Sequence, residues 1–167
     1  MVPSRPLQTS LLTDRLASAA QELSSAAPGM DRARALLQLA SKLPRLPESE
    51  RIRENRVMGC TSQVWVSSRV DQASGQMHFV GDSDSEISRA LAALLCSGLS
   101  GLTPQEISEV DPAALLAALG LGAAAAIPVP SRSSGAMNVL ETILKRARIA
   151  AKVRSSHLPP SCKPIGS

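Results

Sequence analysis

Hydrophobic residues recur at helical spacing twice near the start of the chain, over residues 7–26 and 31–43. Leucine and alanine supply most of both apolar faces, and polar or small residues fill the positions between them. Pro28-Gly29 separates the two runs, because this pair disrupts a helix. The pattern therefore predicts two amphipathic helices, followed by a charged connector over 48–56.

The hydrophobic period becomes that of a β-strand at residues 63–70, where three valines fall on one face. Residues 71–75 have the composition of a turn, and residues 76–81 form a second β-rich run. The two runs predict an antiparallel hairpin. The segment before Cys60 offers a third strand, since an isolated hairpin is only marginally stable.

Helical signals return after the hairpin. The acidic stretch 82–86 suits the start of a helix, because negative charge is favourable at a helix N-terminus. Thr103 and Glu106 have the spacing of a capping box, and Asp111 followed by proline is a second start signal. A last helix is predicted over 133–153. The order of elements predicts an α+β fold, with a small antiparallel sheet packed by several helices.

The length of the chain suits one domain, which we expect at residues 1–154. Residues 155–167 are rich in proline and are predicted to form a disordered tail. The apolar stretch 112–130 has the length of a membrane span, but alanine, glycine and proline dominate it. We expect a short helix and an alanine-rich loop there, and no membrane as a partner. No apolar segment follows the first five residues, so no secretory signal is expected.

Composition and charge narrow the function classes. The core must be aliphatic, because the chain contains one Phe, one Trp and no Tyr although 44% of its residues are hydrophobic. Surfaces for single-stranded nucleic acid rely on stacked aromatic rings, so that class is poorly supported. Of the net charge of +4, residues 132–167 carry +6 and residues 1–131 carry −2. We interpret the basic end as a solvated helix face, and expect no nucleic acid as a partner.

The three cysteines, Cys60, Cys96 and Cys162, cannot all pair with one another, and their spacings fit no zinc framework. We therefore expect an intracellular, reducing compartment. Cys96 lies in an apolar helical run and is predicted to be a core residue. Cys162 lies in the proline-rich tail and is interpreted as an incidental exposed thiol.

Cys60 lies between Gly59 and small polar residues, directly before the first β-rich run. Such a position is typical of a loop, and loops carry functional residues more often than structural ones. A nearby cation such as Arg56 would favour the reactive thiolate. His78 lies one hairpin away, so a Cys–His dyad of a thiol hydrolase or transferase is conceivable. The local context alone leaves both a buried structural thiol and a reactive thiol open.

Metal and phosphate sites have little support. Gly81-Asp82-Ser83-Asp84 could be the start of a calcium loop, but the later ligands of an EF-hand are missing. Helix capping explains this stretch better. The two histidines, His78 and His157, lie far apart in the sequence, and no phosphate-binding glycine loop is present. We therefore expect neither a metal nor a cofactor.

The stretch Gly59-Cys60-Thr61-Ser62-Gln63-Val64-Trp65 resembles the G-C-x-S-Q-V-W signature of the SufE family. The resemblance includes the proline-flanked connector before the loop, Gly81-Asp82-Ser83-Asp84 after it, and Pro130-Ser131-Arg132 at the entry to the last helix. It covers roughly residues 8–150, in order. It implies a SufE/NifU-like α+β fold.

The resemblance also implies a function, that of a covalent sulfur carrier rather than an enzyme. A SufS-type, pyridoxal-phosphate cysteine desulfurase would pass persulfide sulfur to Cys60 and be stimulated in return. A SufBCD-type scaffold would then receive the sulfur for iron–sulfur cluster assembly. The family keeps its cysteine in an apolar cavity until the partner docks. A monomer or a homodimer is expected.

The remaining roles implied by the resemblance fall on residues around the loop. Gly59, Ser62 and Gln63 are expected to support it, and Trp65 to anchor the following strand by burial. Asp84 and Arg132 match family positions that affect loop dynamics or partner docking. The Ala/Ser-rich composition favours the plastid stroma over a bacterial cytoplasm.

Two alternative functions use the same residues differently. One is the thiol hydrolase or transferase, which needs Cys60 and His78 within hydrogen-bond reach. The other is a non-catalytic interaction module whose basic last helix binds nucleic acid, and it predicts an affinity that falls steeply with salt.

Overall fold

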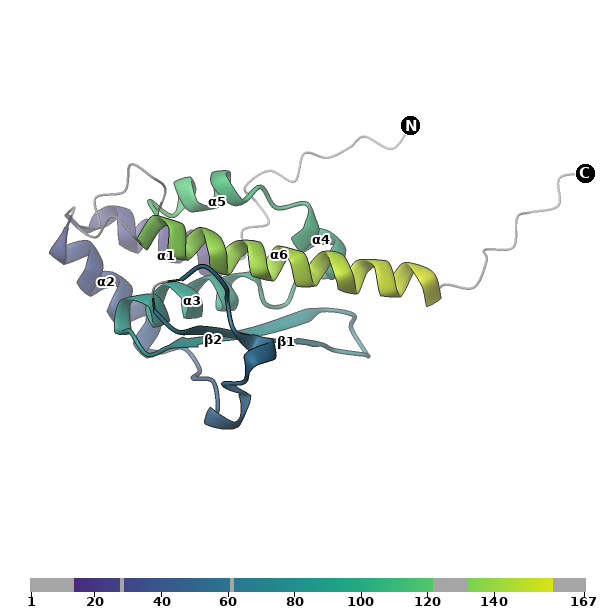
Figure 1. The fold of residues 1–167 in the computed structure, drawn as a ribbon. Coiled ribbons are helices and arrows are strands. Elements are labelled where there is room, and N and C mark those ends of the chain that lie inside the picture. The colour runs from purple at the N-terminus through teal and green to yellow at the C-terminus, as the bar shows by residue number, and fades with distance from the viewer. Residues whose placement is uncertain (1–13, 28, 61, 122–131, 158–167) are drawn as a thin grey trace, which may run out of the picture.

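The computed structural model describes residues 14–27, 29–60, 62–121 and 132–157. A two-stranded hairpin carries helices on one side, and the long helix α6 runs the length of the molecule (Figure 1). The elements in chain order are α1 (Asp14–Ser25), α2 (Met30–Ser41), the 3-10 turns η2 (Glu48–Glu50) and η3 (Arg53–Asn55), β1 (Val64–Val70), β2 (Met77–Ser83), α3 (Glu86–Leu99), α4 (Pro104–Ser108), α5 (Pro112–Ala118) and α6 (Arg132–His157). The predicted α+β fold is confirmed.

The hairpin predicted from the period of its hydrophobic residues is present. β1 and β2 are antiparallel, in a register that pairs Val64 with Ser83 at one end and Val70 with Met77 at the other. Asp71 closes the turn, since its carbonyl accepts the backbone N–H of Gly75 at 2.7 Å. Within the described residues the predicted third strand is reduced to one isolated bridge, between Arg56 and Trp65.

The helix predicted to begin in the stretch 82–86 begins at Glu86, at the end of that stretch. The reason is that Asp82 and Ser83 still pair with β1 and so belong to the sheet. The capping box of Thr103 and Glu106 is confirmed at the start of α4.

Helix α6 continues to His157, so its last turn lies in the segment predicted as a tail. The remainder of that segment, residues 158–167, lies outside the described residues. The division at residue 154 therefore stays a prediction.

The apolar stretch 112–130 begins as predicted with a short helix, α5, capped by Asp111, whose side chain accepts two backbone N–H groups. The expected alanine-rich loop lies mainly in residues 122–131, outside the described residues. In the part of the chain that is described, no helix combines the length and the apolar character needed to span a bilayer.

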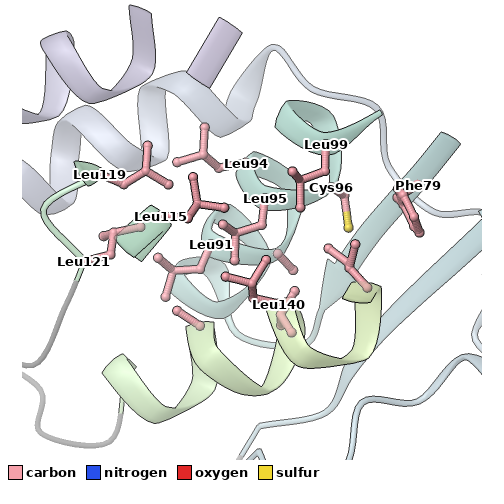
Figure 2. Packing of buried hydrophobic residues seen from close by; sticks show 14 of the residues in the cluster. Phe79, Leu91, Leu94, Leu95, Cys96, Leu99, Leu115, Leu119, Leu121 and Leu140 are labelled. Carbon is pink, nitrogen blue, oxygen red and sulfur yellow. The ribbon is translucent and has the colours of Figure 1, made fainter. Parts of the chain in front are cut away.

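The core is aliphatic, as the composition requires, and α3 lies at its centre (Figure 2). The middle of α3 is buried on nearly all sides because β2, α2 and α6 pack around it. The helix can approach β2 closely because Gly81 has no side chain, and a Cβ there would lie 2.9 Å from the backbone of Ala92. α6 contributes a buried stripe that includes Leu140, Ile143 and Leu144.

Candidate functional site

The loop that carries Cys60 is closed at its base by the hairpin. The backbone N–H of Val57 donates to the carbonyl of Val64 at 2.8 Å, beside the bridge between Arg56 and Trp65. The loop therefore leaves and re-enters the structure at one point, at the end of the hairpin where Val64 pairs with Ser83. Cys60 therefore lies on a short loop whose two ends are held together by backbone pairing.

The Cys60 side chain is half-buried and packs against the hydrophobic core. Burial raises the pKa of the Cys60 thiol, because a thiolate loses hydration in apolar surroundings. A hydrogen bond with the side chain of Asn138 opposes this effect and lowers the pKa, but burial is the larger cause. The thiol is therefore predominantly protonated at neutral pH.

Gly59 makes the close approach between the loop and α6 feasible. Its φ is +83°, in the left-handed region that glycine adopts without strain. A Cβ at this position would lie 3.0 Å from Nδ2 of Asn138. Gly59 therefore lies where the backbone turns and where α6 comes close, and its role in supporting the loop stays a prediction.

Gln63 fixes the second half of the loop through its backbone. Its N–H donates to the carboxylate of Asp84 at 3.1 Å, and its carbonyl accepts the Ser83 hydroxyl at 2.6 Å. The Asp84 N–H also donates to the Gln63 carbonyl, at 3.2 Å. The structure therefore brings Asp84 directly to the loop.

A buried carboxylate, that of Asp82, lies next to the hydrogen bonds between Gln63 and Asp84. The Asp82 side chain is 1% exposed and accepts a hydrogen bond from Nη2 of Arg51 at 3.1 Å. The Arg51 guanidinium also lies over the ring of Trp65, 5.4 Å from the ring centre. Trp65 is itself buried, at 9% exposure, as expected of a strand anchor. These contacts tie the connector before the loop to both strands of the hairpin.

The structure shows fewer contacts for the remaining predicted residues, Ser62 and Arg132. The Ser62 side chain is half-buried and forms no hydrogen bond with another described side chain or backbone group. Arg132 is the first residue of α6, and its side chain lies outside the described residues, as do Thr61 and Cys162. Their predicted roles stay predictions.

The Cys60–His78 dyad is wrong. His78 pairs with Arg69 near the turn of the hairpin, whereas the cysteine loop joins the opposite end at Val64. Arg69 lies five residue steps along β1 from Val64, which at the rise of a β-strand is roughly 17 Å. Proximity in sequence suggested the pair, but the strand register places His78 and the cysteine loop at opposite ends of the hairpin.

Cys96 is the core residue that its apolar context predicted. It is 1% exposed and lies near Phe79 and Leu99 (Figure 2). Burial raises the pKa of its thiol to about 12, so it is inert towards reagents in the folded protein. Of the cysteines in the described residues, Cys60 alone reaches solvent.

The basic residues in the second half of α6 divide into two groups. Arg146 donates to the carbonyls of Val66 and Glu54, and Arg154 donates to the carbonyl of Gly75 at 2.9 Å. These two cations tie α6 to the hairpin and its connector. A second group, Lys145, Arg148 and Lys152, is exposed.

A metal site and a cavity are the other two features that could support chemistry near the loop. Within the described ranges, no three side chains of His, Cys, Asp or Glu gather closely enough to hold a metal ion. A cavity of about 340 Å³ lies between β1 and α6, lined by Arg69, Val70, Arg146 and Ile149 among others. No residue of the cysteine loop lines it.

Sequence analysis did not identify Asn138 or the pair of Arg51 and Asp82. Asn138 is a half-buried amide next to the apolar stripe of α6, and that position was its only signal. Asp82 was assigned to helix capping because it lies in an acidic stretch. Both residues act through contacts between distant parts of the sequence.

The arrangement suits a thiol that reacts with a partner protein. The accessible thiol among the described cysteines is held on a loop, with hydrogen bonds at the base of that loop. Thiol–disulfide and thiol–persulfide exchange require only a thiolate, so this arrangement is suited to them.

Comparisons with known proteins point in the same direction. The sequence model of the SufE family, described as an Fe-S metabolism associated domain, matches residues 17–147. The chain is 38% identical over 128 residues to an uncharacterized SufE-like protein of Rhizobium etli, covering 75% of this chain and 82% of that protein. It is 36% identical over 114 residues to the sulfur acceptor protein CsdE of Escherichia coli, covering 68% of this chain and 75% of CsdE.

Plant proteins of greater length also match. The chain is 47% identical over 153 residues to a chloroplastic quinolinate synthase of Oryza sativa. The match covers 92% of this chain but only 21% of that enzyme. A solution structure of a hypothetical protein from Thermus thermophilus has the same fold, with a TM-score of 0.63 at 24% identity over 83% of this chain and 96% of that one.

Proposed function

The chain belongs to the SufE family, and from that premise we propose that it is a sulfur acceptor of iron–sulfur metabolism that carries sulfur on Cys60. The observation that supports this assignment most directly is the environment of the thiol. Cys60 is half-buried on a loop with a hydrogen-bonded base, and it is the accessible cysteine of the described residues. Sulfur acceptance needs one such thiol and no further catalytic group.

The proposed reaction is an exchange between a persulfide and a thiolate. The Cys60 thiolate attacks the terminal sulfur of a persulfide on a cysteine desulfurase. A new S–S bond forms on Cys60 while the S–S bond on the desulfurase breaks, and the desulfurase cysteine leaves as a thiolate. The product on Cys60 is a persulfide, and no external oxidant or reductant is consumed.

The burial of Cys60 fits this chemistry. A raised pKa keeps the free thiol protonated at neutral pH, and protonated thiols are oxidised slowly. The same shelter would protect the persulfide after transfer. Reaction then requires the loop to move outward when a partner docks, and Gly59 is the residue whose backbone allows such a change.

The partners follow from the family and the named relatives. We propose a SufS-type cysteine desulfurase as the sulfur donor and a SufBCD-type scaffold as the recipient, with the chain acting as a covalent carrier that stimulates the desulfurase. The name of CsdE, a sulfur acceptor protein, supports the first step. The chloroplastic relatives support a plastid location.

The plant relatives favour a second candidate for the recipient. In the rice quinolinate synthase, a region 47% identical to this chain forms part of a polypeptide about five times longer. Sulfur bound to that region would have the remainder of the same polypeptide as its nearest target. We therefore propose quinolinate synthase as an alternative recipient, and transfer of radiolabelled sulfur from the loaded chain to each recipient would separate the two.

Stimulation of a desulfurase tests the proposed function. We expect the chain to increase the rate at which a SufS-type desulfurase produces sulfide from cysteine in the presence of a reductant. Cys60→Ser should abolish this increase, because serine cannot form a persulfide. Cys96→Ala is the matched control and should retain it. Equal stimulation by the Cys60→Ser variant would contradict a covalent carrier.

A further inference from the structure

Asn138 lies on the buried side of the cysteine loop. It is on the second turn of α6, where the neighbouring Ala136, Val139 and Leu140 are buried and fix the helix on the core. The Asn138 carbonyl accepts the hydroxyl of Thr142 at 2.8 Å, one turn further on. The backbone from which the Asn138 side chain projects is therefore held in place independently of the loop.

Two separate contacts join the Asn138 amide to the loop. The amide faces the sulfur of Cys60 as a hydrogen-bond donor that lowers the thiol pKa, which is the sense that favours a negative charge on that sulfur. Its Nδ2 atom also lies 3.0 Å from the point that a Cβ of residue 59 would occupy. The amide thus spans Gly59 and Cys60, and a side chain at residue 59 would crowd it.

We propose that Asn138 is the positioning residue of the sulfur site, whose amide N–H donates to the Cys60 sulfur and holds Gly59 and Cys60 against α6. An amide can donate a hydrogen bond to Cys60 both before and after Cys60 has accepted sulfur. Its N–H groups can donate to a thiolate or to a persulfide anion. The inference rests on the proposed function for its biological meaning, but not for its test.

An aspartate in place of Asn138 would have nearly the same shape but would raise the pKa of the Cys60 thiol instead of lowering it. Its carboxylate has no proton to donate and would repel a negative sulfur. A leucine would retain the shape and remove the donor without adding charge. Of the charged groups on adjoining segments, Arg56 precedes the loop and Asp84 follows β2, and neither is among the causes that shift the pKa of Cys60.

Alkylation of Cys60 across a pH series, with the modified peptide measured by mass spectrometry, separates positioning from simple packing. The rate should rise with pH as the thiolate forms. At pH 8 we expect Asn138→Leu to react about threefold to tenfold more slowly than the parent, and Asn138→Asp more slowly still, because the net contribution of one intramolecular hydrogen bond is about this size. The limiting rate at high pH should stay within about twofold of the parent. Thr142→Val is the matched control on the same helix and should leave the profile unchanged.

A role in packing alone would give a different profile. The loop would loosen, the limiting rate would rise, and the midpoint would fall towards that of an exposed thiol. That result, or profiles of both variants that superimpose on the parent, would overturn the proposal. The alkylation assay uses no desulfurase, so failure here is distinguishable from failure of the sulfur-acceptor function.

A second measurement needs no change at Asn138 and remains valid if its variants do not fold. In the ¹⁵N-labelled parent, the side-chain amide resonances of Asn138 should shift with pH at the midpoint of Cys60 alkylation. In Cys60→Ser the shift should disappear. Resonances that are independent of pH in the parent would contradict the hydrogen bond.

Discussion

Gln63 and Asp84 hold each other through two hydrogen bonds. The Gln63 N–H donates to the Asp84 carboxylate at 3.1 Å, and the Asp84 N–H donates to the Gln63 carbonyl at 3.2 Å. These two hydrogen bonds, which we call the Gln63–Asp84 clasp, fix the end of the cysteine loop to the end of β2. Because the other side of the loop rests on Asn138, Cys60 lies between one contact on the sheet and one on α6.

Removal of the Asp84 carboxylate should loosen the loop with little effect on the fold. Asp84 is exposed, and the lost hydrogen bond is expected to lower the free energy of unfolding by about 1 kcal/mol in Asp84→Ala. Hydrogen exchange at the Gln63 amide should accelerate in Asp84→Ala and much less in Asp84→Asn, which retains an acceptor oxygen. Equal exchange in the parent and Asp84→Ala would show that the clasp does not restrain the loop.

Gly59→Ala should be destabilising for two reasons, and the same substitution at Gly101 separates them. Alanine in the left-handed region costs about 1–2 kcal/mol. Gly101 has a similar φ of +91°, but a Cβ added there would have no atom within 4 Å, so Gly101→Ala reports the backbone cost alone. Chemical denaturation should give a larger loss for Gly59→Ala, because its Cβ also meets Asn138. Equal losses would argue against the contact with Asn138.

The buried ion pair of Arg51 and Asp82 should be important for stability. Asp82→Ala leaves the Arg51 guanidinium without its partner, and we expect a loss of about 3 kcal/mol, at the low end for a buried pair because Arg51 is partly exposed. The exposed pair of Arg34 and Asp31 is the control, where Asp31→Ala should change the unfolding free energy by less than about 1 kcal/mol. Similar effects of the two substitutions would refute this assignment.

Cys96 should make the protein less stable in alkali. Its pKa is about 12 in the folded chain and about 8.5 when unfolded, so above pH 8.5 the unfolded state binds fewer protons. The contribution to stability is complete below pH 8.5 and is lost as pH rises towards 12. Between pH 9 and 10.5 the unfolding free energy of the parent should fall more steeply than that of Cys96→Ala, by on the order of 1 kcal/mol per pH unit. Parallel slopes would contradict the shift.

The elements of the fold were largely predictable because their signals are local. The alternating valines and the turn residues predicted the hairpin, and the spacing of Thr103 and Glu106 predicted the start of α4. The acidic stretch 82–86 was only partly understood, because its residues serve several partners at once. Asp82 pairs with Arg51, Asp84 holds Gln63, and only Glu86 begins the helix.

For the candidate site, the sequence pointed to Cys60 but not to most of the residues that contact its loop. The motif identified the thiol, but the contacts that hold it come from residues far away in the sequence. Asn138 lies 78 positions after Cys60, and no local pattern predicts that their side chains meet. His78 shows the opposite error, since it is nearer in sequence but at the wrong end of the hairpin.

Site-resolved mass spectrometry tests the central claim most directly. The chain is incubated with a SufS-type desulfurase and cysteine, then alkylated, digested and analysed without reductant. We predict that the peptide containing Cys60 gains the mass of one sulfur atom, and that the peptides containing Cys96 and Cys162 do not. Sulfur on either of those peptides with Cys60 unmodified, or no added sulfur on any peptide while the desulfurase is stimulated, would contradict a role for Cys60 as the sulfur acceptor.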